Sequence, residues 1–216
     1  MKEITLYNNY YDAAGGNIRI TSIDMNKLED FEKVIRIFRD YPYYEILSEK
    51  DCEDELACYQ DNKGIAFGCY LDDNIVGVNC VEYGYDKSHN HSVDFNIDYK
   101  KVAYFSGLTM LERNNNLYLR RKGLGTLLVT KTDEYLQNLK DKDGLKKFLC
   151  AYARVMRYES KSRHIFERTG FSQAYNNSNQ PIVDVCTYKC NLINPKTNDY
   201  CYNTDERTYL IKKYKQ

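Results

Sequence analysis

A strand–helix–strand pattern lies in the middle of the sequence and restricts the fold more than any other feature. An extended region is best developed near 102–111, apolar residues recur at helical spacing over about 123–138, and a continuous apolar run follows at 145–155. A crossover of this length joins parallel strands of one sheet and places the helix against one face. The pattern therefore predicts an α/β or α+β fold with one parallel pair of strands near its centre.

The flanking segments predict further strands and helices around this crossover. Two β-rich runs, 64–71 and 75–85, flank the polar turn Asp72-Asp73-Asn74, as in a hairpin. No linker-like tract interrupts the chain, so 1–216 is predicted to be a single domain with a polar extension at 193–216, which could pack as a late strand or contribute to a homodimer contact. The other predicted elements are strands at 17–23 and 183–192, and helices at 25–40, 48–60 and 160–170.

The charge balance argues against a large class of partners. The chain has 31 Lys and Arg against 31 Asp and Glu, a formal net charge of zero, so nucleic acid or an anionic membrane is not expected as the main partner. The sequence has no apolar run long enough for a membrane span and no secretory layout at its start, which favours the cytoplasm. The eight cysteines are then expected to be reduced and mostly buried, and the three histidines lack zinc-finger spacing, so no metal site is predicted.

The string Arg120-Arg121-Lys122-Gly123-Leu124-Gly125 stands where a strand passes into the crossover helix. Helix N-termini expose unpaired amides and a partial positive charge, and glycines let an anion come close to the backbone. A Walker loop is excluded because the sequence does not contain a glycine followed, after four residues, by Gly-Lys-Ser/Thr. A Rossmann fingerprint would need glycine at position 128, where this sequence has Leu128. The local chemistry still favours a ligand that carries a pyrophosphate.

A second motif follows at a fixed distance from the first. Arg120, Gly123 and Gly125 match R-x-x-G-x-G, and the helix at 160–170 ends in Ile165-Phe166-Glu167-Arg168-Thr169-Gly170-Phe171. In this order and spacing the sequence resembles the GNAT superfamily of acyl-CoA N-acyltransferases over about 60–192. The resemblance implies a mixed, mostly antiparallel sheet whose fourth and fifth strands, 102–111 and 147–155, are parallel but splay apart. In that family acetyl-CoA fills the splay as a cosubstrate, without a metal.

The resemblance also implies where acetyl-CoA would bind. Its pantetheine arm would pair with the backbone of the fourth strand, and its pyrophosphate would rest on the glycine loop. The family's asparagine near the start of the last helix aligns with Glu159, so nearby serines are expected to touch the ligand instead. The residues expected to contact acetyl-CoA are Leu108, Thr109, Met110, Arg120, Arg121, Lys122, Gly123, Leu124, Gly125, Thr126, Ser160, Ser162 and Phe166.

The catalytic groups depart from the family pattern. The usual proton-donating tyrosine falls on Phe166. Tyr158 or Tyr152 could substitute, or each could be a packing tyrosine. By order of elements, Glu112 and Glu82 are the carboxylates placed to act as a general base.

The implied function is transfer of an acetyl group from acetyl-CoA to a primary amine, by direct attack in a ternary complex. Two alternatives stay open: a catalytically silent CoA-binding module, which the phenylalanine at position 166 favours, and a GNAT-type toxin that acts on aminoacyl-tRNA, which the neutral charge disfavours. The sequence does not identify the acceptor.

Overall fold

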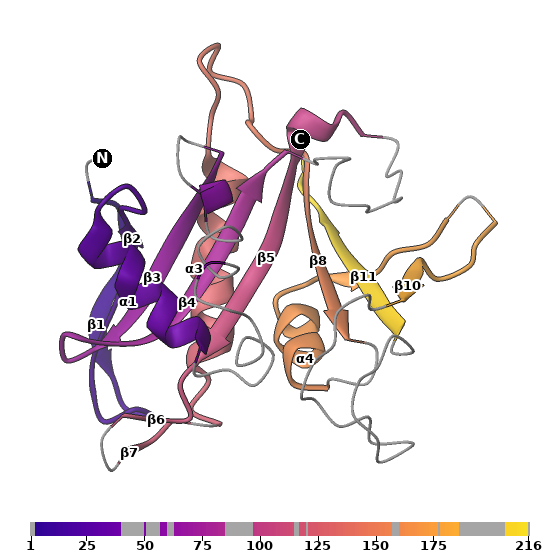
Figure 1. The fold of residues 1–216 in the computed structure, drawn as a ribbon. Coiled ribbons are helices and arrows are strands. Elements are labelled where there is room, and N and C mark those ends of the chain that lie inside the picture. The colour runs from indigo at the N-terminus through magenta and orange to yellow at the C-terminus, as the bar shows by residue number, and fades with distance from the viewer. Residues whose placement is uncertain are drawn as a thin grey trace.

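The computed structural model describes residues 3–39, 50, 57–59, 63–84, 97–114, 117–119, 121–156, 160–176, 178–185 and 206–215 (Figure 1). In these ranges most of the strands join one large sheet, with helices packed on its two faces. The strands are β1 (Thr5–Tyr11), β2 (Gly16–Ile23), β3 (Gly64–Leu71), β4 (Asn74–Tyr83), β5 (Val102–Met110), β6 (Arg113–Asn114), β7 (Leu117–Tyr118), β8 (Cys150–Met156), β9 (Ser172–Gln173), β10 (Val183–Val185) and β11 (Glu206–Lys213). The helices are α1 (Leu28–Arg39), α3 (Leu124–Asn138) and α4 (Ser160–Arg168), with short 3₁₀ turns at Ala57–Tyr59 and Tyr99–Lys101.

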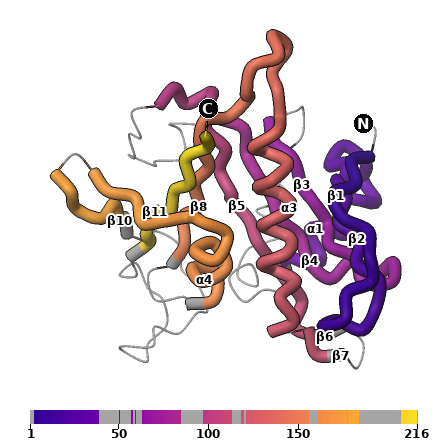
Figure 2. Tube along the Cα trace, turned by 180° about the vertical axis from the view of Figure 1, so that it is seen from behind, coloured from indigo at the N-terminus to yellow at the C-terminus, as the bar shows by residue number. Residues whose placement is uncertain are grey.

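The large sheet has the strand order β1-β2-β3-β4-β5-β8-β11-β10, and β9 pairs with β11 beside β10. Every neighbouring pair in it is antiparallel except β5 and β8, which are parallel and are joined through α3. The predicted fold class is therefore confirmed: a mixed, mostly antiparallel sheet with one central β-α-β crossover. Figure 2 shows α3 lying along the back of the sheet between β5 and the first strands.

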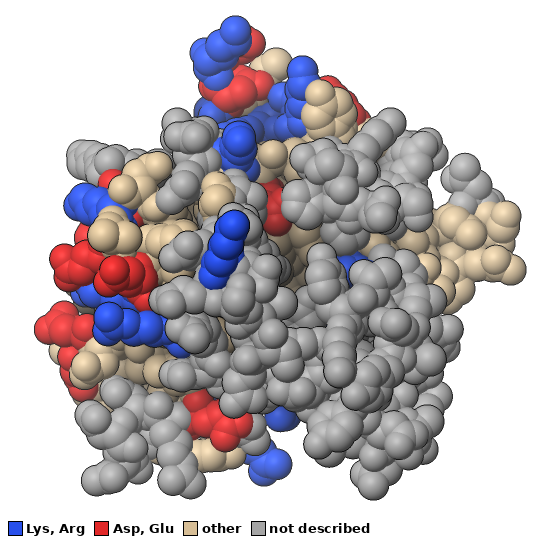
Figure 3. Space-filling view, in the orientation of Figure 1, with Lys and Arg blue, Asp and Glu red and all other residues tan. Residues whose placement is uncertain are grey.

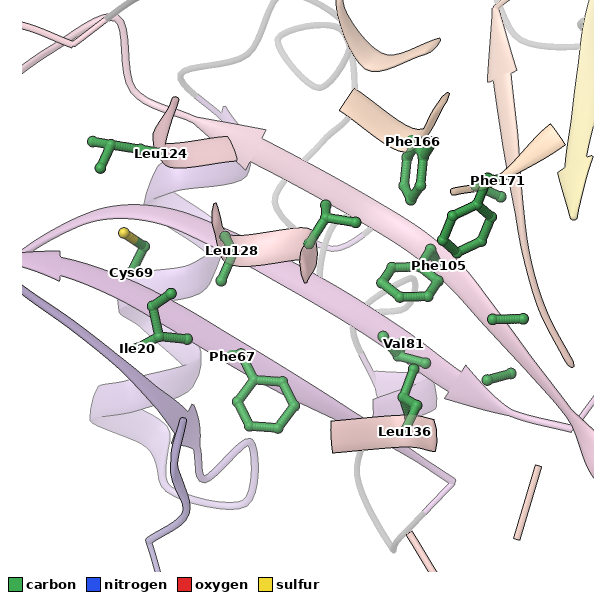
Figure 4. Packing of buried hydrophobic residues seen from close by; sticks show 14 of the residues in the cluster. Ile20, Phe67, Cys69, Val81, Phe105, Leu124, Leu128, Leu136, Phe166 and Phe171 are labelled. Atoms are coloured by element: carbon green, nitrogen blue, oxygen red, sulfur yellow. The ribbon is translucent and has the colours of Figure 1, made fainter. Parts of the chain in front are cut away.

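Two apolar clusters hold the helices against opposite faces of the sheet. One cluster joins α3 and α4 to the face that carries Ile20, Phe67, Val81 and Phe105 (Figure 4). The other joins α1 to the opposite face. Because α3 is fixed by this burial along its whole length, the position of its N-terminus relative to β5 is set by the core.

The central predictions are confirmed with small shifts at the ends. The predicted hairpin appears as β3 and β4, and the predicted helix at 25–40 begins only at Leu28, because residues 24–27 form a hydrogen-bonded turn. The apolar run at 145–155 becomes a strand only from Cys150, after a loop closed by the Lys140–Lys146 bridge. Most of the predicted helix at 48–60 and of the predicted strand at 183–192 lies outside the described residues.

Of the two terminal strands, β1 was not predicted. The polar extension, which could pack as a late strand, holds β11, and β11 lies inside the sheet between β8 and β10. Cys69, Cys80 and Cys150 are buried, as expected, and burial raises the pKa of the Cys69 thiol to about 12. No helix in the described ranges is both long and apolar enough to cross a membrane.

A buried carboxylate fastens β11 to α3. Asp133 of α3 is 2% exposed and accepts hydrogen bonds from Lys212 Nζ at 2.6 Å, Gln137 Nε2 at 2.6 Å and Tyr214 Oη at 2.8 Å. The same ammonium donates to the carbonyl of Thr169, just after α4, at 2.6 Å. Burial and the neighbouring carboxylate raise the pKa of the Tyr214 hydroxyl well above its usual value, so it remains a donor. One lysine thus links β11, α3 and the end of α4.

Lys212→Met should lower the free energy of unfolding by about 3 kcal/mol, because it leaves the Asp133 charge buried with one donor fewer. Urea unfolding followed by circular dichroism measures the change. Lys213→Met is the matched control, since Lys213 is exposed and should lose less than about 0.5 kcal/mol. Equal losses in the two variants would show that the buried pair adds nothing to stability.

Candidate functional site

The parallel ladder between β5 and β8 is short. It holds four residue pairs, from Val102 opposite Cys150 to Phe105 opposite Ala153. Beyond that point β5 continues to Met110 and β8 to Met156, but no further pairing between them is present among the described residues. The two strands therefore part at Phe105 and Ala153, as the splay prediction requires, and their facing backbone edges are left without each other as partners.

A β-bulge lies at the point where the strands part. Cys80 of β4 pairs with Gly107 and Val81 pairs with Phe105, so Ser106 is an extra residue in β5. The Ser106 hydroxyl is hydrogen-bonded to the Tyr59 hydroxyl, which comes from a 3₁₀ turn packed against β3 and β4. A bulge bends its strand, and this one stands next to the last pair of the ladder.

Three phenylalanine rings pack together on the α4 side of the same point. Phe105 contacts Phe166 and Phe171 edge-to-face, each with ring centroids 5.5 Å apart, and the latter two rings are 5.2 Å from each other (Figure 4). Phe166 is 3% exposed, so the residue in the family's tyrosine position is a core residue that fixes α4 against β5. The sequence prediction listed it among the acetyl-CoA contacts, and its ring packs against Phe105 and Phe171.

The glycine loop forms the predicted helix start. Gly123 is the N-cap of α3 in the left-handed conformation, with φ 78°, and no side chain caps the helix. The first helical bond runs from the Leu127 amide to the Gly123 carbonyl, so the amides of Leu124, Gly125 and Thr126 have no acceptor within the helix. We call these three amides the anion seat.

Charge near the anion seat favours an anion. The first turn of α3 contains no acidic residue, and the helix dipole adds partial positive charge there. Arg121 is exposed with φ 63°, and Lys122 is half-buried beside it. Arg120, the third predicted cation, lies outside the described residues.

Gly125 marks the place where α3, α4 and β5 meet. A Cβ atom there would lie 2.9 Å from Ile165 Cδ1 and 3.5 Å from Met110 Cγ. The part of β5 that pairs with β4 but not with β8 therefore runs from the bulge towards the anion seat and ends beside it. Leu108 and Met110 are half-buried against the cluster under α3, whereas Thr109 is buried.

The predicted carboxylates lie far apart. Glu82 of β4 is directly opposite Tyr104 of β5, and Tyr104 pairs with Tyr152 of β8, one position before the strands part. The two tyrosine rings stack at 4.5 Å with an interplanar angle of 9°, on the sheet face away from α3. Because residues directly opposite each other share a face, the half-buried Glu82 belongs to this group.

Glu112 lies beyond the end of β5, is exposed, and accepts a backbone hydrogen bond from Leu119 at 2.9 Å. Six residues of extended chain place it roughly 20 Å from the bulge. Of the remaining predicted residues, Tyr158 lies outside the described ranges. Ser160 is the first residue of α4, and Ser162 is half-buried in the first turn of that helix. Between β5 and the glycine motif, β6 and β7 form a short antiparallel ladder.

One residue at the anion seat was missed by the sequence analysis. A Cβ atom on Gly123 would lie 2.9 Å from the hydroxyl of Tyr11, at the end of β1. No local pattern could have revealed this neighbour, because β1 reaches α3 only through the packing of the whole sheet. No group of three or more potential metal-ligating side chains occurs in the ranges that the structure describes.

No family model matches the sequence, and no curated protein is significantly similar to it. Solved structures do match. The chain is similar to a GNAT-family acetyltransferase from Streptococcus pneumoniae (12% identity, TM-score 0.57, covering 91% of this chain and 99% of that one). It is also similar to an N-acetyltransferase from Staphylococcus aureus Mu50 (12% identity, TM-score 0.61, covering 93% of this chain and 100% of that one). A third similar structure is Arabidopsis thaliana NAA60 in complex with acetyl-CoA (12% identity, TM-score 0.58, covering 91% of this chain and 98% of that one).

These matches span nearly the whole of each protein, at an identity that establishes architecture alone. They agree with the predicted resemblance. The chain therefore has the fold of the GNAT acetyltransferases.

Proposed function

We propose that the protein is an N-acyltransferase that transfers an acetyl group from acetyl-CoA to a primary amine. The observation that carries this proposal is the parting of β5 from β8 beside an uncapped helix N-terminus. The similar fold of a protein solved with acetyl-CoA supports it. We propose further that 1–216 works as a single domain, because β1, β11 and the crossover all belong to one sheet.

In this proposal the ligand binds both to the edge of β5 that β8 leaves open and to the anion seat. Backbone groups of β5 beyond the bulge would hydrogen-bond the amides of the pantetheine arm, in the manner of strand addition. The diphosphate would lie on the anion seat, with Arg121 and Lys122 attracting its oxygens. The thioester would then lie near Ser106, where the strands part.

The transfer step needs a base close to that point. The amine nitrogen attacks the thioester carbonyl carbon, the carbon–sulfur bond breaks, and the sulfur leaves with the electron pair. The attacking nitrogen gives up a proton, and the thiolate takes one. Glu82 is the candidate base, directly or through water, because it pairs with Tyr104, one residue before β5 and β8 separate. Glu112 lies near the diphosphate end of the proposed site. Tyr158 and Tyr152 stay the predicted proton donors.

A silent CoA-binding module keeps one observation in its favour, the buried Phe166 in place of a tyrosine. The aminoacyl-tRNA alternative loses support, because the two basic clusters of the sequence do not form one surface. Arg121 and Lys122 precede α3, whereas Lys146 and Lys147 follow it, and a helix of 15 residues separates them by roughly 20 Å. Figure 3 shows Lys and Arg side chains, mixed with acidic ones, at the end where the loop after α3 protrudes.

Acetyl-CoA and CoA should raise the melting temperature of the protein. At a concentration about 100 times the dissociation constant the stabilisation is about 2.7 kcal/mol, or roughly 5–10 °C for a chain of this size. A thermal-shift scan measures this, and release of free thiol with a panel of amines then separates a transferase from a silent module. A scan without any shift at saturating ligand would remove the basis of the proposal.

Replacing Arg121 and Lys122 together by alanine should weaken CoA binding about tenfold at low salt, with a smaller difference at high salt. Titration calorimetry at two salt concentrations measures both effects. The matched control neutralises two exposed lysines beyond the other end of α3, Lys140 and Lys142, and should leave the affinity within about twofold. Equal weakening in both double variants would indicate a general charge effect rather than contact with the diphosphate.

Glu82→Gln should lower kcat by on the order of 10²–10⁴ with little change in CoA affinity, as expected for loss of a general base. Steady-state kinetics with the best amine of the panel provide the test. Glu112→Gln is the comparison, and its kcat should fall less than about threefold. The assignment is wrong if Glu112→Gln is the more damaging change, or if both variants keep full activity.

A further inference from the structure

We propose that Tyr11 is a further binding residue of the acetyl-CoA site and that its hydroxyl donates a hydrogen bond to the diphosphate. This inference rests on the proposed function, and it adds a residue from β1, which lies at the opposite edge of the sheet order from β10.

The hydroxyl of Tyr11 lies against the N-cap of α3. Gly123 has no Cβ, and one placed there would be 2.9 Å from Tyr11 Oη, closer than side chains normally approach. Gly123 is also left-handed. The left-handed backbone angle favours glycine at this position, and a Cβ atom there would also displace the tyrosine hydroxyl. The amides of the anion seat begin at the next residue, so a phosphate bound to them lies within reach of that hydroxyl.

The hydroxyl is available for a ligand. Within the described part of the chain Tyr11 Oη has no hydrogen-bond partner, although the ring is half-buried against the core cluster under α3. Such a hydroxyl can donate one hydrogen bond, and a phosphate oxygen is a strong acceptor. An uncharged donor adds direction to the site, whereas Arg121 and Lys122 supply mainly charge.

The backbone holds Tyr11 in place before any ligand arrives. Its carbonyl accepts hydrogen bonds from the amides of Ala14 at 3.0 Å and Gly15 at 2.9 Å, which close the turn between β1 and β2. Tyr11 also ends the β1–β2 ladder, opposite Gly16. A donor fixed in this way loses little conformational freedom on binding, which strengthens its contribution to affinity.

Tyr11→Phe removes the hydroxyl and keeps the ring, so the melting temperature without ligand should not change. Titration calorimetry should show CoA binding about tenfold weaker than for the unmodified protein, the size expected for one hydrogen bond to a charged group. Turnover should show a raised KM for acetyl-CoA with kcat kept. S-acetylpantetheine, which lacks the diphosphate, should be used equally well by both proteins.

Tyr10→Phe is the matched control, because Tyr10 is the neighbouring residue of the strand, faces the opposite side and is 61% exposed. It should bind CoA as the unmodified protein does. If the unmodified protein binds CoA and Tyr11→Phe binds it equally well, the inference about Tyr11 is wrong and the proposed function stands. If the unmodified protein does not bind CoA at all, both fail. Equal weakening by Tyr10→Phe would also overturn the specific role of Tyr11.

Discussion

The incomplete pairing of β5 with β8 is the constraint on which the other features depend. Two parallel strands joined by a crossover helix would normally pair along their common length, yet the ladder ends after four residue pairs. The bulge at Ser106 bends one strand, and the rings of Phe105, Phe166 and Phe171 hold α4 at the same point. Backbone groups left unpaired inside a protein are unfavourable. A ligand with amide groups along an extended arm would restore the missing hydrogen bonds.

The same architecture carries the helix N-terminus to the end of the open strand edge. α3 is held against the sheet by apolar burial and, in its middle, by the Asp133 carboxylate, which binds the C-terminal strand through Lys212 and Tyr214. Lys212 also contacts the chain just after α4. The elements that border the splay are therefore fixed to one another by groups far from it, and the strand that closes this arrangement comes from the last residues described.

Local pattern was enough to predict the centre of the molecule. The crossover at 102–155 and the hairpin around Asp72 depend on residues close in sequence, and both were predicted nearly to their ends. Long-range pairing was not predictable in this way: β1 meets α3, and β11 meets β8, only in the assembled sheet. The same holds for the candidate site: the glycine loop was predicted from its sequence motif, whereas the position of Tyr11 was not. The order of elements also ranked Glu112 with Glu82, although one lies beyond the end of β5 and the other beside the parting.

Hydrogen exchange of backbone amides, with and without CoA, tests the central claim most directly. The account predicts that the amides of Val102–Phe105 are already protected by pairing with β4 and β8. The amides of Ser106–Met110 that do not donate to β4, and the amides of Leu124–Thr126, gain protection when CoA is added. The account is contradicted if Ser106–Met110 is as fully protected as Val102–Phe105 without any ligand, or if saturating CoA changes neither segment.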